Sequence, residues 1–311
     1  MPFPVAMAVA AGTGFVALSY EILWVRALSY VNGGRPWTFG CLLGSYLAGV
    51  ALASRECQKL GERHPEPGPR HRAVLALAVM AGGVVAYAVI PVLAALAPSR
   101  AWPAALVLLA VAAGSLGAAL PLTAHLAIPP DDRAGARLSY VYLSDIVGSA
   151  AGGAVTGYLS LDWMPLAAVN VVMAVLAVVL GAALFVTSGL SLRTMRSGAV
   201  AAAAVAAACI ALGKPLHERL WERLKLHGPA ASNERFAEVI ENRHGIIAVT
   251  ESGIVMGGGV YDGAFSTDIV HDRNAISRAR LFEGARRCFC KDADVRACVV
   301  RDHGPVPVIV Q

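Results

Sequence analysis

The chain has 311 residues, of which 57% are hydrophobic and only 15% are charged, and its mean hydropathy is +0.60. A soluble domain carries about 25% charged residues. The composition therefore excludes an ordinary soluble protein, and apolar runs of about 20 residues indicate a polytopic α-helical membrane protein embedded in a lipid bilayer. The net charge of +5 is typical of basic loops that determine membrane topology, so no nucleic-acid partner is expected.

The first apolar run, 4–31, places two charged residues within the membrane. Its segment FVALSYEILWVR contains Glu21 and Arg26. A charge inside a span costs about 2.5–3.5 kcal/mol on insertion scales, so each is a functional-site hypothesis by default. The alternative is a structural pair, or an Arg26 side chain that reaches the membrane interface. The two residues lie about 140° apart around a helix, so a partner on another helix is expected for each.

Five further runs have the length and composition of spans. The run 138–160, the fifth in chain order, is the least hydrophobic. Its only charge is Asp145, and small residues that include Gly148 and Gly152 form a face suited to close helix packing. Asp145 is a third intramembrane polar candidate, and we hypothesise that it pairs with Arg26. The five runs cover residues 37–54, 73–96, 104–127, 138–160 and 165–187.

A seventh run, 198–213, is rich in alanine and short, so the bundle has six or seven spans. Basic loops at 55–72, 128–137 and 188–196 place these loops and the N-terminus in the cytoplasm. If 198–213 spans, the C-terminal part lies outside. The segment 214–227 is itself basic and amphipathic, which favours a helix in the membrane interface and a cytoplasmic C-terminal part. The expected location is the inner (plasma) membrane.

Residues 246–268 differ from everything before them. IIAVT is typical of a short strand, ESG of a tight turn and IVM of a returning strand. Gly257, Gly258 and Gly259 then allow a sharp bend or a close approach of the backbone. They do not form a phosphate-binding loop, because no Lys and Ser/Thr pair follows them. The segment therefore predicts a small β-hairpin module after the helical bundle.

Three segments together resemble the membrane-anchored branch of the polyamine aminopropyltransferase (spermidine synthase-like) family. They are FVALSYEILWVR, the Gly-rich DIVGSAAGGAVTGYLSL, and VIENRHGIIAVTESGIVMGGGVYDGAFSTDIVHDRNAISR. The resemblance implies a β-hairpin domain followed by a Rossmann-like domain. That second domain binds decarboxylated S-adenosylmethionine and transfers an aminopropyl group to a diamine.

The family's hairpin domain carries a Leu-Asp-Gly motif, which Tyr261, Asp262 and Gly263 match loosely. The resemblance thus implies substrate-binding roles for these three residues, with a polyamine as partner. Past them Ser266 replaces the family's Gln, and no further role carries over. The tail 281–311 holds no GxGxG or GxGxxG. We therefore expect the Rossmann-like domain, the catalytic residues and the cofactor to be absent from this chain, which looks truncated or frame-shifted.

The tail also contains Cys288, Cys290, Cys298 and His303. Their spacing is not that of a standard zinc site, so no metal is expected. The predicted organisation is a transmembrane domain at 1–213, an amphipathic helix and linker at 214–232, a β module at 233–280 and an atypical tail at 281–311.

Two functions follow from the sequence. One is an aminopropyltransferase-like membrane protein of polyamine biosynthesis that lacks its catalytic half. The other is a transporter or binding protein for polyamines or other small molecules, with Glu21, Arg26 and Asp145 as its polar site. Six or seven spans are fewer than the twelve of a major-facilitator transporter, so a homodimer is a possible assembly. A non-catalytic remnant is the third alternative.

Overall fold

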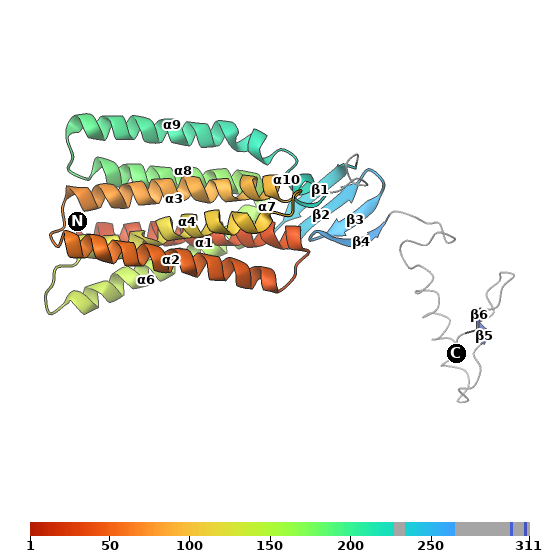
Figure 1. The fold of residues 1–311 in the computed structure, drawn as a ribbon, viewed down its shortest axis with the longest axis horizontal. Helices are drawn as coiled ribbons and strands as arrows, with labels where there is room; N and C mark the ends of the chain where they lie inside the picture. Colours follow the sequence, from red (N-terminus) through yellow and green to blue (C-terminus); the bar gives the residue numbers. More distant parts are fainter. Residues whose placement is uncertain (227–233, 265–298, 301–307, 310–311) are drawn as a thin grey trace.

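The computed structural model describes residues 1–226, 234–264, 299–300 and 308–309. Long helices lie side by side in a bundle, and a small sheet covers one end of it (Figure 1). Six helical stretches are long and apolar enough to cross a membrane. They are α1 (Phe3–Asn32), α2 (Trp37–Arg63), α3 (Pro69–Leu96), the stretch Trp102–Ala127, α8 (Leu166–Val186) and α9 (Leu192–His217).

The fourth of these stretches is interrupted. It consists of a 3-10 turn, η1 (Trp102–Ala104), then α4 (Ala105–Gly117) and α5 (Ala119–Ala127). The break at Ala118 lies just before Pro121, as expected for a proline whose ring prevents a regular preceding turn. A further helix, α6 (Ala134–Ala154), continues as a π-helix, η2 (Val155–Ser160), and a last turn, α7 (Leu161–Trp163). These elements occupy the fifth predicted run, which is not among the six stretches apolar enough to span by length and composition, although α6 packs along α1.

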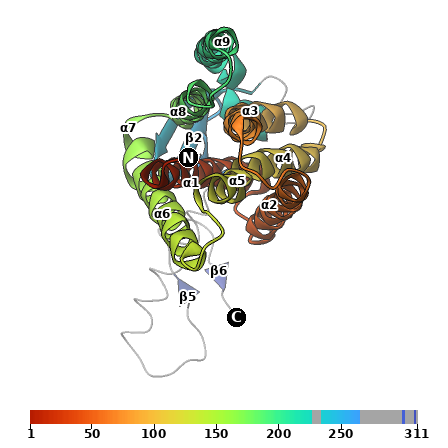
Figure 2. The same ribbon diagram turned by 90° about the vertical axis from the view of Figure 1, so that its left-hand side faces the viewer.

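The packing of α1 against α6 is the most extensive between two helices, and it depends on glycine. A methyl group at Gly148 would overlap the carbonyl oxygen of Ala11, and one at Gly152 would overlap that of Phe15. This order of contacts shows that the two helices run in the same direction, side by side (Figure 2). The small-residue face predicted for the fifth run is therefore confirmed as a helix-packing surface.

The alanine-rich run is part of α9, which covers 26 residues and extends along the whole bundle. Gly198 lies against Phe185 and Gly213 against Val171, so α9 runs antiparallel to α8. A buried polar contact fixes its end, because His217 Nε2 lies 2.9 Å from Asn170 Nδ2. The structure thus favours a span for this run rather than an interfacial position.

The module is a four-stranded antiparallel sheet in which each strand pairs with the next in the chain. Its strands are β1 (Phe236–Asn242), β2 (Gly245–Thr250), β3 (Ile254–Gly257) and β4 (Val260–Ala264). The predicted hairpin of IIAVT and IVM is confirmed as β2 and β3. Gly258 and Gly259 form the next turn with φ of 57° and 79°, a conformation that glycine adopts without steric cost.

The fold class predicted from the sequence is confirmed. Within the described residues the only sheet besides β1–β4 is the short pair β5 (Val299–Val300) and β6 (Val308–Ile309), and no Rossmann-like domain is present. The predicted module boundary at residue 280 and most of the tail 281–311, including its three cysteines and His303, lie outside the described residues.

The two ends of the bundle differ. The N-terminus lies at one end together with the connections α2–α3, α5–α6 and α8–α9, which are the predicted basic loops. The sheet β1–β4 lies at the other end, with the connections α1–α2 and α3–η1 and with α7 (Figure 1). The polar residues that join the sheet to the bundle are therefore at the end opposite the basic loops.

Candidate functional site

A short helix, α10 (Leu220–Lys225), lies between α9 and the first strand of the sheet in the chain. The predicted amphipathic segment 214–227 divides into the end of α9 and this helix. Its apolar residues Leu220, Trp221 and Leu224 are buried as part of the main core cluster. The apolar side of the segment therefore covers the bundle instead of lying in lipid.

Glu241 of β1 connects three elements. Its Oε1 accepts a hydrogen bond of 2.6 Å from Trp221 Nε1, and its Oε2 accepts one of 2.8 Å from the backbone N–H of Leu166. Leu166 is the first residue of α8, where backbone N–H groups lack helical partners and a carboxylate is favourable. One side chain of the sheet thus holds both α10 and the start of α8.

Arg26 of α1 connects the bundle to the sheet. Its Nη2 donates to the backbone carbonyl oxygens of Asn242 and Gly245, the latter at 2.6 Å. These carbonyls belong to the β1–β2 turn, so an arginine in the first span holds the turn of a sheet more than 200 residues away in the sequence. Arg26 therefore has a structural partner, and the hypothesis that it pairs with Asp145 is wrong.

Two more contacts complete the attachment. The backbone N–H of Phe236 donates to Glu222 Oε1 at 2.9 Å, and the backbone N–H of Arg243 donates to Asp162 Oδ1 at 2.8 Å. The Arg243 guanidinium also lies 3.4 Å from the Asp162 carboxylate. Several elements share these bonds, so the sheet and the bundle end are joined by a network of hydrogen bonds.

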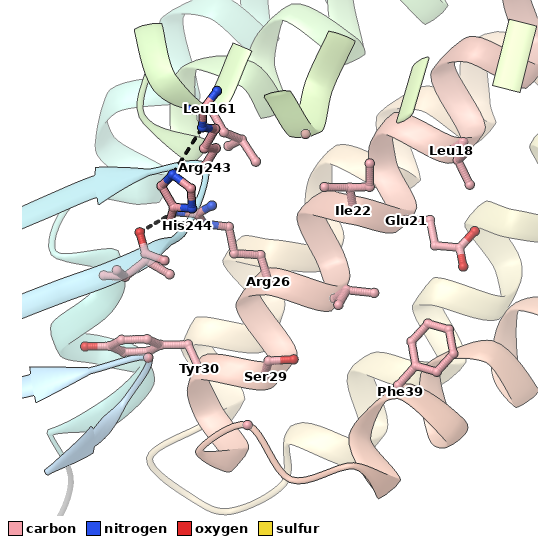
Figure 3. Close-up of a pocket in the computed structure, with 16 residues that line it drawn as sticks. Leu18, Glu21, Ile22, Arg26, Ser29, Tyr30, Phe39, Leu161, Arg243 and His244 are labelled. Atoms are coloured by element: carbon pink, nitrogen blue, oxygen red, sulfur yellow. Dashed lines mark hydrogen bonds between the residues drawn. The ribbon is translucent and has the colours of Figure 1, made fainter. Parts of the chain in front are cut away.

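A cleft of about 500 Å³ lies at this junction. Its bundle wall is formed by α1, with contributions from α2, η2 and α7, and its module wall by the β1–β2 turn and the glycine turn after β3. Figure 3 shows Arg26 directed toward the β1–β2 turn and Glu21 directed away from it. The lining residues are Leu18, Glu21, Ile22, Val25, Arg26, Ser29, Tyr30, Gly34, Phe39, Gly157, Leu161, Arg243, His244, Gly245, Ile246 and Gly258.

Glu21 is the exceptional group in this lining. It is half-buried, and its carboxylate has no hydrogen bond or ion pair with another described residue. Neither arginine of the cleft is bonded to Glu21, since Arg26 Nη2 donates to two carbonyls and Arg243 pairs with Asp162. The carboxylate of Glu21 thus has no direct partner in the cleft, and Arg26 Nε is likewise buried without one.

Asp145 lies outside this lining. Its carboxylate and carbonyl oxygens lie against Gly14, two helical turns before Glu21 on α1. Of the three intramembrane candidates, the structure brings Glu21 and Arg26 into one cleft and leaves Asp145 deeper in the helical region.

The three residues to which the family resemblance assigns substrate binding, Tyr261, Asp262 and Gly263, lie on β4, an edge strand of the sheet. Tyr261 is 51% exposed, and Asp262 is exposed as well. They are not part of the junction cleft.

Sequence reasoning missed the role of the β1–β2 turn, where Arg243 and His244 form one side of the cleft. The segment ENRHG gave only the signal of a tight turn.

No cluster of three or more His, Cys, Asp or Glu side chains suited to a metal ion occurs in the part of the chain that the structure describes. Comparison of the chain with protein-family models, with curated proteins and with solved structures finds no match. Six apolar spans and the attached sheet define the class: the chain is a multi-pass α-helical membrane protein with a small β module at one end of its bundle.

Proposed function

We propose that this protein binds a small organic ammonium compound in the junction cleft, and that it carries or presents that compound at the membrane. The observation that supports this function is the unpartnered carboxylate of Glu21 in a half-buried cleft. A carboxylate in such surroundings favours a charged hydrogen-bond donor, and an ammonium group supplies three. Intramembrane acids of this kind mark substrate pathways in other transport proteins.

The position of the two arginines is essential to this proposal. If the Arg26 guanidinium were not held by the sheet, it could form an ion pair with Glu21 and occupy the carboxylate that the proposal assigns to the ligand. Its donation to the carbonyls of Asn242 and Gly245 removes that possibility. Arg243 is likewise held by Asp162.

The test measures equilibrium binding of radiolabelled amines to the full chain in lipid nanodiscs. Glu21→Gln should weaken amine binding at least tenfold, because the charge-assisted hydrogen bond is lost. Glu66→Gln, in the exposed α2–α3 loop, is the matched control and should bind normally. Equal affinities for the two variants would refute the function. If Glu21→Gln weakens binding and Glu66→Gln does not, amine uptake by proteoliposomes above that of empty vesicles distinguishes transport from binding alone.

A second candidate is the aminopropyltransferase-like function implied by the family resemblance, with polyamine as ligand. It is favoured by the antiparallel β module, which occupies the place of the family's hairpin domain, and by the exposure of Tyr261 and Asp262 on β4. Here the diamine would contact the module and not the bundle. Asp262→Asn should then weaken the binding of every amine that the protein binds while Glu21→Gln leaves it unchanged, the opposite of the result expected from the cleft.

We further propose that the β module faces the side opposite the basic loops. The segments 55–72, 128–137 and 188–196, which include the adjoining helix ends at the N-terminal end of the bundle, carry nine Lys and Arg residues, and the connections α1–α2 and α3–η1 at the module end carry two, Arg35 and Arg100. With the basic loops in the cytoplasm, the module is extracytoplasmic. This revises the cytoplasmic side preferred from the sequence, because that preference required α9 not to span. The nine residues are Arg55, Lys59, Arg63, Arg70, Arg72, Arg133, Arg137, Arg193 and Arg196.

A further inference from the structure

The depth of Glu21 in the bilayer restricts the kind of amine that can reach it. Exposed aromatic side chains lie at the module end of the bundle: Trp163 is 81% exposed, Tyr158 is 68% exposed, and Trp37 lies against Trp102 in a tilted arrangement with ring centroids 5.6 Å apart. Such aromatic residues mark the membrane–water interface. Asp162, next to Trp163, holds the β1–β2 turn, so this turn and Arg26 lie near the interface.

Glu21 lies deeper than Arg26. The five residues between them correspond to a rise of about 7–8 Å along α1, and the chain direction of α1 leads from the far end of the bundle toward the sheet. The carboxylate is therefore within the hydrocarbon region. The cleft at this level is formed by Leu18, Ile22 and the 52% exposed Phe39.

The charge pattern of the cleft then excludes a second ammonium group. Toward the interface, a second positive charge would lie beside Arg26, whose charge is not cancelled by the neutral carbonyls of Asn242 and Gly245, and it would be repelled. Toward the membrane centre it would lie among apolar side chains, where an unpaired charge is strongly unfavourable. Asp145 offers no compensation, because it does not line the cleft.

We infer that the ligand is a lipophilic monoamine, with one ammonium group at Glu21 and an apolar tail between α1, α2 and η2. This inference rests on the proposed amine-binding function and specifies its ligand class. The tail has room beside Gly157 of η2, where the nearest side-chain atom to an added Cβ is Ile22 Cδ1 at 3.8 Å. A π-helical segment often occurs at a functional site, and here it places a glycine on the cleft wall.

The experiment compares two ligands that differ only in the second charge. Hexylammonium and 1,6-diaminohexane have the same chain, and their binding to the full chain in nanodiscs is measured with subtraction of empty nanodiscs. Hexylammonium should bind at least tenfold more tightly. Across butyl-, hexyl- and octylammonium the affinity should rise about threefold to fourfold for each buried methylene.

Gly157→Leu provides the structural arm of the test, because its side chain fills the space beside Ile22. It should weaken octylammonium binding at least tenfold and affect butylammonium less. Gly135→Leu is the matched control, since Gly135 lies at the far end of α6 with no atom within 4 Å of an added Cβ. Thermal unfolding of both variants, followed by tryptophan fluorescence, verifies that each is folded.

The outcomes separate the two proposals. If Glu21→Gln alters the binding of no amine, the function itself is refuted. If Glu21→Gln weakens binding but the diamine equals or exceeds the monoamine, amine binding stands and the lipophilic ligand class is refuted. An affinity independent of chain length in the folded wild-type protein would also overturn the ligand class.

Discussion

The guanidinium of Arg26 donates a hydrogen bond of 2.6 Å to the carbonyl oxygen of Gly245. A charged residue in the first span is thus used to hold the turn of a sheet that follows all the spans. An arginine in an apolar span is unfavourable unless its donors find acceptors, and here backbone carbonyls supply them. The consequence for the cleft is that Glu21 forms no ion pair with Arg26.

Removal of this contact should loosen the module. Arg26→Gln replaces charged hydrogen bonds, each worth about 1.5–3 kcal/mol, and should increase amide hydrogen exchange in the β1–β2 turn at least tenfold. Arg196→Gln, at the exposed start of α9, is the control for loss of a positive charge. Unchanged protection of residues 242–246 in Arg26→Gln would show that the arginine does not position the turn.

Glu241 should contribute to stability through its two donors. In Glu241→Gln one carboxylate oxygen becomes an NH2 group that faces an N–H donor, either Trp221 Nε1 or the backbone of Leu166. The expected loss is about 1–3 kcal/mol, visible as a lower unfolding temperature in detergent and a shift of the Trp221 emission. Glu238→Gln, exposed on the same strand, should leave both unchanged.

The glycine contacts between α1 and α6 should be sensitive to a single methyl group. Gly148→Ala introduces a Cβ that overlaps the backbone of Ala11, and overpacking of this kind costs about 1–3 kcal/mol. Gly135→Ala, in open space on the same helix, should be neutral or slightly stabilising. The measurement is thermal unfolding of both variants, and equal unfolding temperatures would contradict the close approach of the two backbones.

The charge of Lys225 should make stability depend on pH. Burial, with a smaller contribution from Arg35, lowers the pKa of the Lys225 ammonium group below its ordinary value. The charged form is therefore disfavoured in the folded state. This cost is present at neutral pH and disappears as the pH rises from the lowered pKa toward the unfolded value of about 10.4.

Lys225→Met should thus raise the unfolding temperature at pH 7, and the difference should shrink at pH 10. The rise is about 1–2 °C, because solvent screens a group that is half exposed. A difference that grows with pH would show that the sign is wrong.

Cysteine labelling tests the side of the module. In a background without native cysteines, Glu66→Cys in the α2–α3 loop and Glu251→Cys in the β2–β3 turn are both exposed. In intact cells an impermeant maleimide should react with Glu251→Cys and reach Glu66→Cys only after lysis. Labelling of both positions before lysis, or of Glu66→Cys alone, would contradict the proposed orientation.

The sequence by itself determined the class of the fold, because a span needs about 20 apolar residues and a hairpin needs alternating residues with a turn, and both are local patterns. It also identified Glu21 and Arg26 as exceptional, since a charge in an apolar run is unfavourable wherever it lies. Only the tertiary structure decided their partners. The contact of Arg26 with Gly245 joins residues 219 positions apart, and no periodicity encodes such a distance.

The same reason explains Asp145 and the seventh span. Asp145 could be paired with Arg26 from charge alone, but the parallel packing of α1 and α6 places it beside Gly14. The alanine-rich run was ambiguous on hydropathy, and its position was decided by the contacts of α9 with α8 and by the buried pair His217 and Asn170. Local composition thus determined which elements form, and packing between distant elements decided which polar groups were satisfied and which, such as the carboxylate of Glu21, have no partner among the described residues.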